Sequence, residues 1–193
     1  MRSHLTWYVA RGSGIVTWGL LVASMAWGLL YATRVMRRRV SLWWLLGVHR
    51  FLGVLAIVFT GVHVTALVLD RFINFSLTDV LVPFTSSWHP IATGWGIIAM
   101  YLLLAIEGTS LLKARLPHHW WRAVHLASYP LFALATVHAL SAGTDTRAVI
   151  GDGLALSFGA ISIALALVGL DRRAGVDPPR RPLDALGVPG TSR

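Results

Sequence analysis

Cysteine is absent from this chain of 193 residues. Its absence excludes disulfide bonds, cysteine-ligated zinc, iron–sulfur clusters and haem attached through a C-x-x-C-H motif. Charged residues are also scarce, at 13% of the chain, whereas soluble domains have about 25%. Acidic residues are the rarer charged class, with 8 Asp and Glu against 17 Lys and Arg. The composition therefore excludes an ordinary soluble domain.

Apolar residues make up 55% of the chain, and the mean hydropathy is +0.65. They form continuous blocks that are long enough to cross a bilayer as helices. The five blocks cover residues 13–33, 42–69, 90–112, 120–141 and 146–170. We therefore predict an all-α integral membrane protein, a five-span helical bundle within residues 1–172. The Pro-, Gly- and Arg-rich residues 173–193 are predicted to form a disordered cytoplasmic tail.

The net charge of +9 comes from short basic clusters between the apolar blocks, not from one helix face. This pattern excludes a nucleic-acid partner and instead indicates topology. Most basic residues fall on one side of the membrane if the loop at 34–41 is cytoplasmic. We therefore predict an outside N-terminus, a cytoplasmic C-terminus and a multi-pass protein of a bacterial plasma (inner) membrane. The loop at 70–89 is then outside, and its "LTDVLVPF" segment is too short to span.

Four histidines lie inside the predicted spans, in two similarly spaced pairs: His49 with His63, and His125 with His138. Each pair follows a Trp-Trp dipeptide, and each histidine follows a valine. A polar ring in hydrocarbon is costly, so an intramembrane histidine is a candidate functional residue. The alternative is a histidine that only hydrogen-bonds a neighbouring helix. The repeated spacing favours the functional interpretation.

The second and fourth spans run in the same direction, so His49 should lie level with His125, and His63 with His138. Fourteen helical residues rise about 21 Å, which is too far for one metal ion. Two levels suit two b-type haems, each held by one histidine from each helix. With both axial positions of iron taken, the expected chemistry is one-electron transfer across the lipid bilayer.

The fourth span has a geometric problem. At about 100° per residue, His125 and His138 differ by roughly 220° around an ideal helix, so they would not share a face. Pro130 lies between them and lacks a backbone donor. We therefore predict a helix irregularity around residues 126–130 that turns one ring toward the common face.

On these residues the chain resembles the ferric-reductase-like transmembrane domain family. That family includes ferric reductases, NADPH oxidase membrane domains and the haem subunit of bacterial methionine sulfoxide reductase. The stretch "WWRAVHLASYPLFALATVHALSAGTDT" carries the second pair of the resemblance, which extends over residues 42–170. The resemblance implies an electron-transfer subunit of an oxidoreductase. Because no flavin domain is visible, it also implies a separate donor, a cytosolic flavin reductase or quinol, and an outer-face acceptor protein.

Haem propionates require cations or an aqueous interface. Arg50 and Arg122 flank the predicted inner pair and are our candidates for this role, and Arg71 and Arg147 are available outside. Each also fits ordinary positive-inside topology or a snorkelling side chain.

Several other polar residues have two readings. Glu107, inside the third span, fits a proton relay or quinol site, although an ion pair with Arg50 or Arg115 is favoured. His89, His118 and His119 fit partner contacts, although exposed loop positions are favoured, and Asp145 is predicted to cap the fifth helix.

Two alternatives to the di-haem prediction remain. One is a haem-free transporter or assembly subunit whose histidines pack or relay protons. The other is a mono-haem membrane protein that uses a single pair. Proton relays usually mix acids with histidine, and only one glutamate lies within the spans.

Overall fold

The computed structural model describes residues 2–33, 40–70 and 75–143, and every element in these ranges is a helix. This confirms the all-α prediction for the described residues. The helices are α1 (Arg2–Thr33), α2 (Leu42–Leu69), α3 (Leu77–Leu81), α4 (Pro90–Leu111), a 3₁₀ turn (Lys113–Arg115), α5 (His118–Leu126) and α6 (Ser128–Ala142).

Four helical segments are long and apolar enough to cross a membrane: Leu5–Ala32, Leu42–Leu69, Pro90–Leu111 and His118–Ala142. They correspond to the first four predicted spans, so the chain is an integral membrane protein. The predicted fifth span at 146–170 and the tail at 173–193 lie outside the described residues, and the sidedness of the termini stays a prediction.

The first helix begins at Arg2, well before the predicted residue 13. The helix therefore includes the charged Arg11, which precedes the predicted span. In the structure the Arg11 guanidinium lies over the Trp7 ring, 4.5 Å from its centre. The Ser13 hydroxyl donates to the Val9 carbonyl at 2.6 Å. A charge and a hydroxyl satisfied in this way allow the helix to continue.

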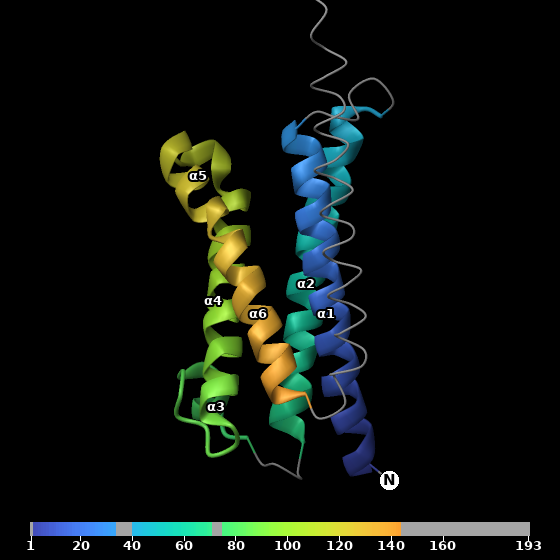
Figure 1. The fold of residues 1–193 in the computed structure, drawn as a ribbon, viewed down its shortest axis with the longest axis vertical. Helices are drawn as coiled ribbons and strands as arrows, with labels where there is room; N and C mark the ends of the chain where they lie inside the picture. Colours follow the sequence, from blue (N-terminus) through green and yellow to red (C-terminus); the bar gives the residue numbers. More distant parts are fainter. Residues whose placement is uncertain (1, 34–39, 71–74, 144–193) are drawn as a thin grey trace, which may run out of the picture.

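The long helices form two antiparallel pairs, α1 with α2 and α4 with α6, which lie side by side in Figure 1. The two pairs meet in a small apolar core of Ala56, Ala99, Leu103, Ile106 and Leu131, from α2, α4 and α6. Alanines in this core let the helices approach closely, as is usual between membrane helices. Beside this core a cavity lies between the two pairs, at the site described below.

The two ends of the bundle differ. At one end, here called the α3 end, lie the beginning of α1 and the short helix α3, whereas α5 marks the opposite, α5 end (Figure 1). Helix α3 begins with a capping box in which the Ser76 side chain and backbone bond Asp79. These hydrogen bonds hold the pKa of the Asp79 carboxyl below its usual value. The prediction that this segment is too short to span is confirmed.

The predicted irregularity in the fourth span is confirmed. The helix breaks at Ala127, whose backbone N–H turns back to the Val124 carbonyl at 3.0 Å, and α6 begins at Ser128. Pro130 lies in the first turn of α6, where its missing N–H costs least. His125 therefore lies on α5 and His138 on α6, so their directions are set by different helices.

Candidate functional site

Two pairs of histidine rings face each other between the α1–α2 and α4–α6 halves. His49 on α2 meets His125 on α5, with ring centres 6.0 Å apart and ring planes at 78°. His63 on α2 meets His138 on α6, with centres 6.3 Å apart and planes at 80°. The structure thus brings together the residues that the sequence pairs. They are called below the His49 pair and the His63 pair.

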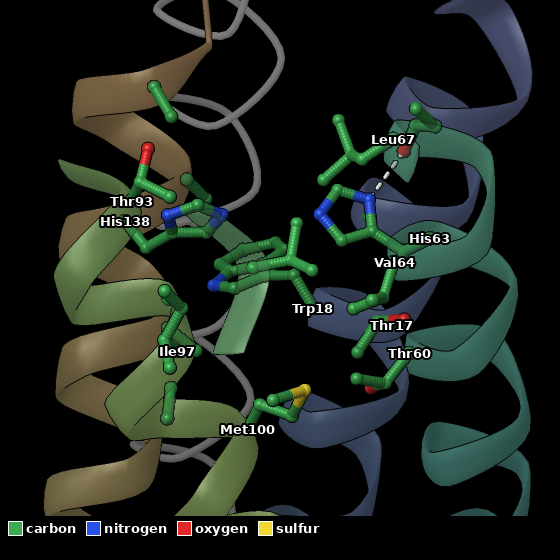
Figure 2. Close-up of a pocket in the computed structure, with 18 of the residues that line it drawn as sticks. Thr17, Trp18, Thr60, His63, Val64, Leu67, Thr93, Ile97, Met100 and His138 are labelled. Carbon is green, nitrogen blue, oxygen red and sulfur yellow. Dashed lines mark hydrogen bonds between the residues drawn. The ribbon is translucent and has the colours of Figure 1, made fainter. Parts of the chain in front are cut away.

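Both rings of the His63 pair are oriented by backbone carbonyls. The His63 Nδ1 lies 2.7 Å from the Ala10 oxygen on α1, and the His138 Nδ1 lies 2.8 Å from the Ala92 oxygen on α4. A carbonyl can only accept, so each Nδ1 must carry the proton and donate. In a neutral imidazole the Nε2 lone pair is then free. Figure 2 shows the two rings directed into the same space from opposite halves.

A cavity of about 260 Å³ surrounds the His63 pair. Its walls are mostly apolar and include Trp18, Ile97 and Met100, all labelled in Figure 2. The Trp18 indole is itself satisfied, because its Nε1 donates to the Thr136 hydroxyl at 3.0 Å. An apolar cavity with two imidazole nitrogens suits a flat, largely apolar cofactor.

Arg11 also lines this cavity, and sequence reasoning missed it. The residues Trp7, Arg11, Gly14 and Trp18 follow one another at three- or four-residue steps and all line the cavity. This helical periodicity was the signal that could have identified the face. It was overlooked because the predicted span began at residue 13.

The His49 pair is held differently. The His49 Nδ1 lies 3.0 Å from the Ser24 carbonyl oxygen and 3.2 Å from its hydroxyl. The His125 Nδ1 is buried and has no hydrogen-bond partner among the described residues. Its ring instead stacks on Trp121, with centres 5.1 Å apart and planes at 21°. The Lys113 ammonium covers the same indole at 3.7 Å.

Of the remaining candidates, His89 lies at the α3 end, the others that the structure describes lie near the α5 end, and three lie outside the described residues. Arg50 and Arg122 are exposed. Glu107 packs against Gly53 of α2 and forms neither a hydrogen bond nor an ion pair within the described ranges, so the favoured pairing with Arg50 or Arg115 was wrong. His89, His118 and His119 are exposed, as expected, but His118 and His119 lie in the first turn of α5 and not in a loop. Arg71, Asp145 and Arg147 lie outside the described residues.

No group of three or more metal-ligating side chains occurs in the part of the chain that the structure describes. A metal bound by protein ligands alone usually has three or four of them. Each facing histidine pair supplies only two imidazole ligands, fewer than such a site needs.

Comparison with known proteins gives one family. The family described as "Ferric reductase like transmembrane component" matches residues 12–136, about two thirds of the chain. The match begins in α1 and includes three of the four paired histidines, and it ends just before His138. No curated protein and no solved structure matches the chain.

Proposed function

Because the chain belongs to the ferric reductase like transmembrane component family, we propose that it is a b-type cytochrome that passes electrons across the membrane. One haem would lie between His49 and His125, and the other between His63 and His138. The observation that carries this proposal is the pair of facing histidine couples at two depths.

The spacing of the rings fits one metal ion per pair. An imidazole nitrogen binds a metal at about 2 Å, and the ring centre lies about 1.2 Å behind it, so two opposed rings have centres about 6.4 Å apart. The observed separations of 6.0 and 6.3 Å are close to this value.

The surroundings of the rings support the same role. Metal-binding histidines usually donate their second ring nitrogen to a carbonyl, which fixes the tautomer and the ring orientation. His49, His63 and His138 lie within hydrogen-bonding distance of such carbonyls. A haem with two imidazole ligands has no open position on iron and supplies one-electron transfer. The protein would therefore hold the rings and exclude water, without binding a substrate at the metal.

Donor and acceptor belong to the proposal as well. The α5 end presents Lys113, Arg115 and Arg122, all exposed, and none of the described residues from 108 to 143 is acidic. Such a surface attracts an acidic partner and speeds its association. We assign the donor, a cytosolic flavin reductase or a quinol, to this end and an acceptor protein to the α3 end. Arg50 and Arg122 at one level, and Arg11 at the other, are the proposed propionate partners.

Two measurements test this proposal, an absorption spectrum and the number of haems per chain. The protein is purified in detergent, and its reduced-minus-oxidised spectrum and haem-to-protein ratio are measured. We expect a b-type spectrum and two haems per chain. One haem per chain would support the mono-haem alternative, and a protein without haem would overturn the proposal in favour of a transporter or assembly subunit.

A further inference from the structure

Three of the four paired histidines share a detail that the haem proposal does not require. Each ring reaches a helix carbonyl at residue i, and residue i+4 of that helix is glycine. The three sets are His63 with Ala10 and Gly14, His49 with Ser24 and Gly28, and His138 with Ala92 and Gly96. They involve two different helices, α1 and α4, so the detail is not a property of one segment.

The geometry of a helix explains why the glycine is needed. A side chain at i+4 leans toward the N-terminus and covers the turn that contains the carbonyl of residue i. A ring that approaches this carbonyl must therefore cross the place of that side chain. A Cβ at Gly14 would lie 3.1 Å from the His63 ring, one at Gly28 3.1 Å from His49, and one at Gly96 2.6 Å from His138.

Other glycines in the same helices do not have this environment. A Cβ added at Gly12, Gly19 or Gly108 would meet nothing within 4 Å. Small residues in membrane helices often serve close helix packing. At Gly14, Gly28 and Gly96 the nearest atoms belong to histidine rings and not to a neighbouring backbone. The contact is therefore specific to the rings.

We propose that Gly14, Gly28 and Gly96 are positioning residues that give His63, His49 and His138 access to a carbonyl and so fix their tautomer and direction. His125 has no such glycine, and stacking on Trp121 holds its ring instead. The His63 pair thus has two rings held by a carbonyl, whereas the His49 pair has one. This inference rests on the proposed haem-binding function, which it deepens.

The experiment compares G14A, G28A and G96A with the matched variants G12A, G19A and G108A in the full chain. Haem release to an excess of apomyoglobin is followed, together with the electron paramagnetic resonance signal of each ferric haem. Loss of a partner that orients a metal-binding histidine typically weakens metal binding 10–100-fold. We expect release from the His63 pair to accelerate roughly 10-fold or more in G14A and most strongly in G96A, and release from the His49 pair to accelerate in G28A.

If the glycines position individual rings, each substitution should affect only one haem, whereas a general folding defect would affect both. In each variant the haem of the other pair should keep its signal and its release rate, and the matched variants should behave as the wild type. Equal weakening of both haems by one substitution, or no difference between the two sets of variants, would overturn the inference.

A second measurement does not depend on haem. The ¹⁵N shifts of histidine side chains in the haem-free protein report which ring nitrogen carries the proton. We expect the Nδ1–H form for His49, His63 and His138, and its loss at the affected ring in each glycine variant. If the purified wild-type protein contained no haem, the proposed function would be wrong. If the ¹⁵N shifts were unchanged in the glycine variants, the glycines would not position the rings.

Discussion

The imidazole of His63 is surrounded by atoms that restrict its chemistry. Its Nδ1 donates to the Ala10 carbonyl, and its ring lies against Gly14. A neutral ring held in this way offers one lone pair in one direction. The hydrogen bond to Ala10 also joins α2 to α1, and the facing His138 ring is what distinguishes His63 from a histidine with a packing role alone. The same reasoning applies to His138 on the opposite side of the cavity.

Replacing one ring should affect one site. In H63A or H138A we expect loss of the haem between these two residues, so the haem-to-protein ratio falls from about two to about one. The haem of the His49 pair should remain, because roughly 21 Å of helix separates His49 from His63. H49A or H125A should give the reciprocal result in the same spectra. Loss of all haem from H63A alone would contradict two independent sites.

The residues of the site were predictable to different degrees. His49, His63, His125 and His138 stand out because a polar ring in an apolar block needs an explanation. Arg11 was missed because the start of α1 was placed too late. Glu107 was assigned an ion pair that the structure does not contain within the described residues, because sequence distance says nothing about side-chain direction.

The break between α5 and α6 allows His125 and His138 each to face a histidine of α2. An uninterrupted helix would place His125 and His138 roughly 220° apart around its axis. The turn at Ala127 allows α5 and α6 to present these rings to His49 and His63 separately. Pro130 favours this break because a helix cannot continue with normal hydrogen bonds on its N-terminal side.

Straightening this segment should therefore disturb one ring more than the other. In P130A the N–H at position 130 can bond the carbonyl four residues earlier, which favours a continuous helix. We expect His125 to lose its position, because its Nδ1 has no hydrogen bond to hold it within the described residues. The haem of the His49 pair should be lost or weakened roughly 10-fold in release assays. P83A, in the loop after α3, is the control, and wild-type release in P130A would count against the role of the break.

The arrangement of the two helical pairs creates the site. Each half contributes one histidine to each couple: α2 supplies His49 and His63, and the α4–α6 half supplies His125 and His138. The halves are joined by the small core around Leu103 and Leu131, and the cavity of the His63 pair lies between them.

The absence of cysteine makes the orientation directly measurable. Ser87 lies exposed at the α3 end, and Ala114 lies exposed at the α5 end. We expect a membrane-impermeant maleimide to label S87C but not A114C in intact cells, since the basic residues should keep the α5 end in the cytoplasm. Permeabilised cells, in which both variants should react, provide the control. Labelling of A114C alone would reverse the proposed direction of electron flow.

The apolar blocks in the sequence were enough to predict a membrane protein and four of its helices, since length and hydrophobicity alone decide whether a segment can cross a bilayer. The spacing of the histidines likewise predicted which of them pair, because the rise of a helix converts residue spacing into depth in the membrane. Three-dimensional packing was needed for the rest. The carbonyls that face the rings, the glycines beside them and the position of Arg11 come from α1 and α4, which are distant in sequence from the histidines they contact. Such contacts depend on the rotation of each helix about its own axis, and no local pattern in the histidine segments specifies that rotation.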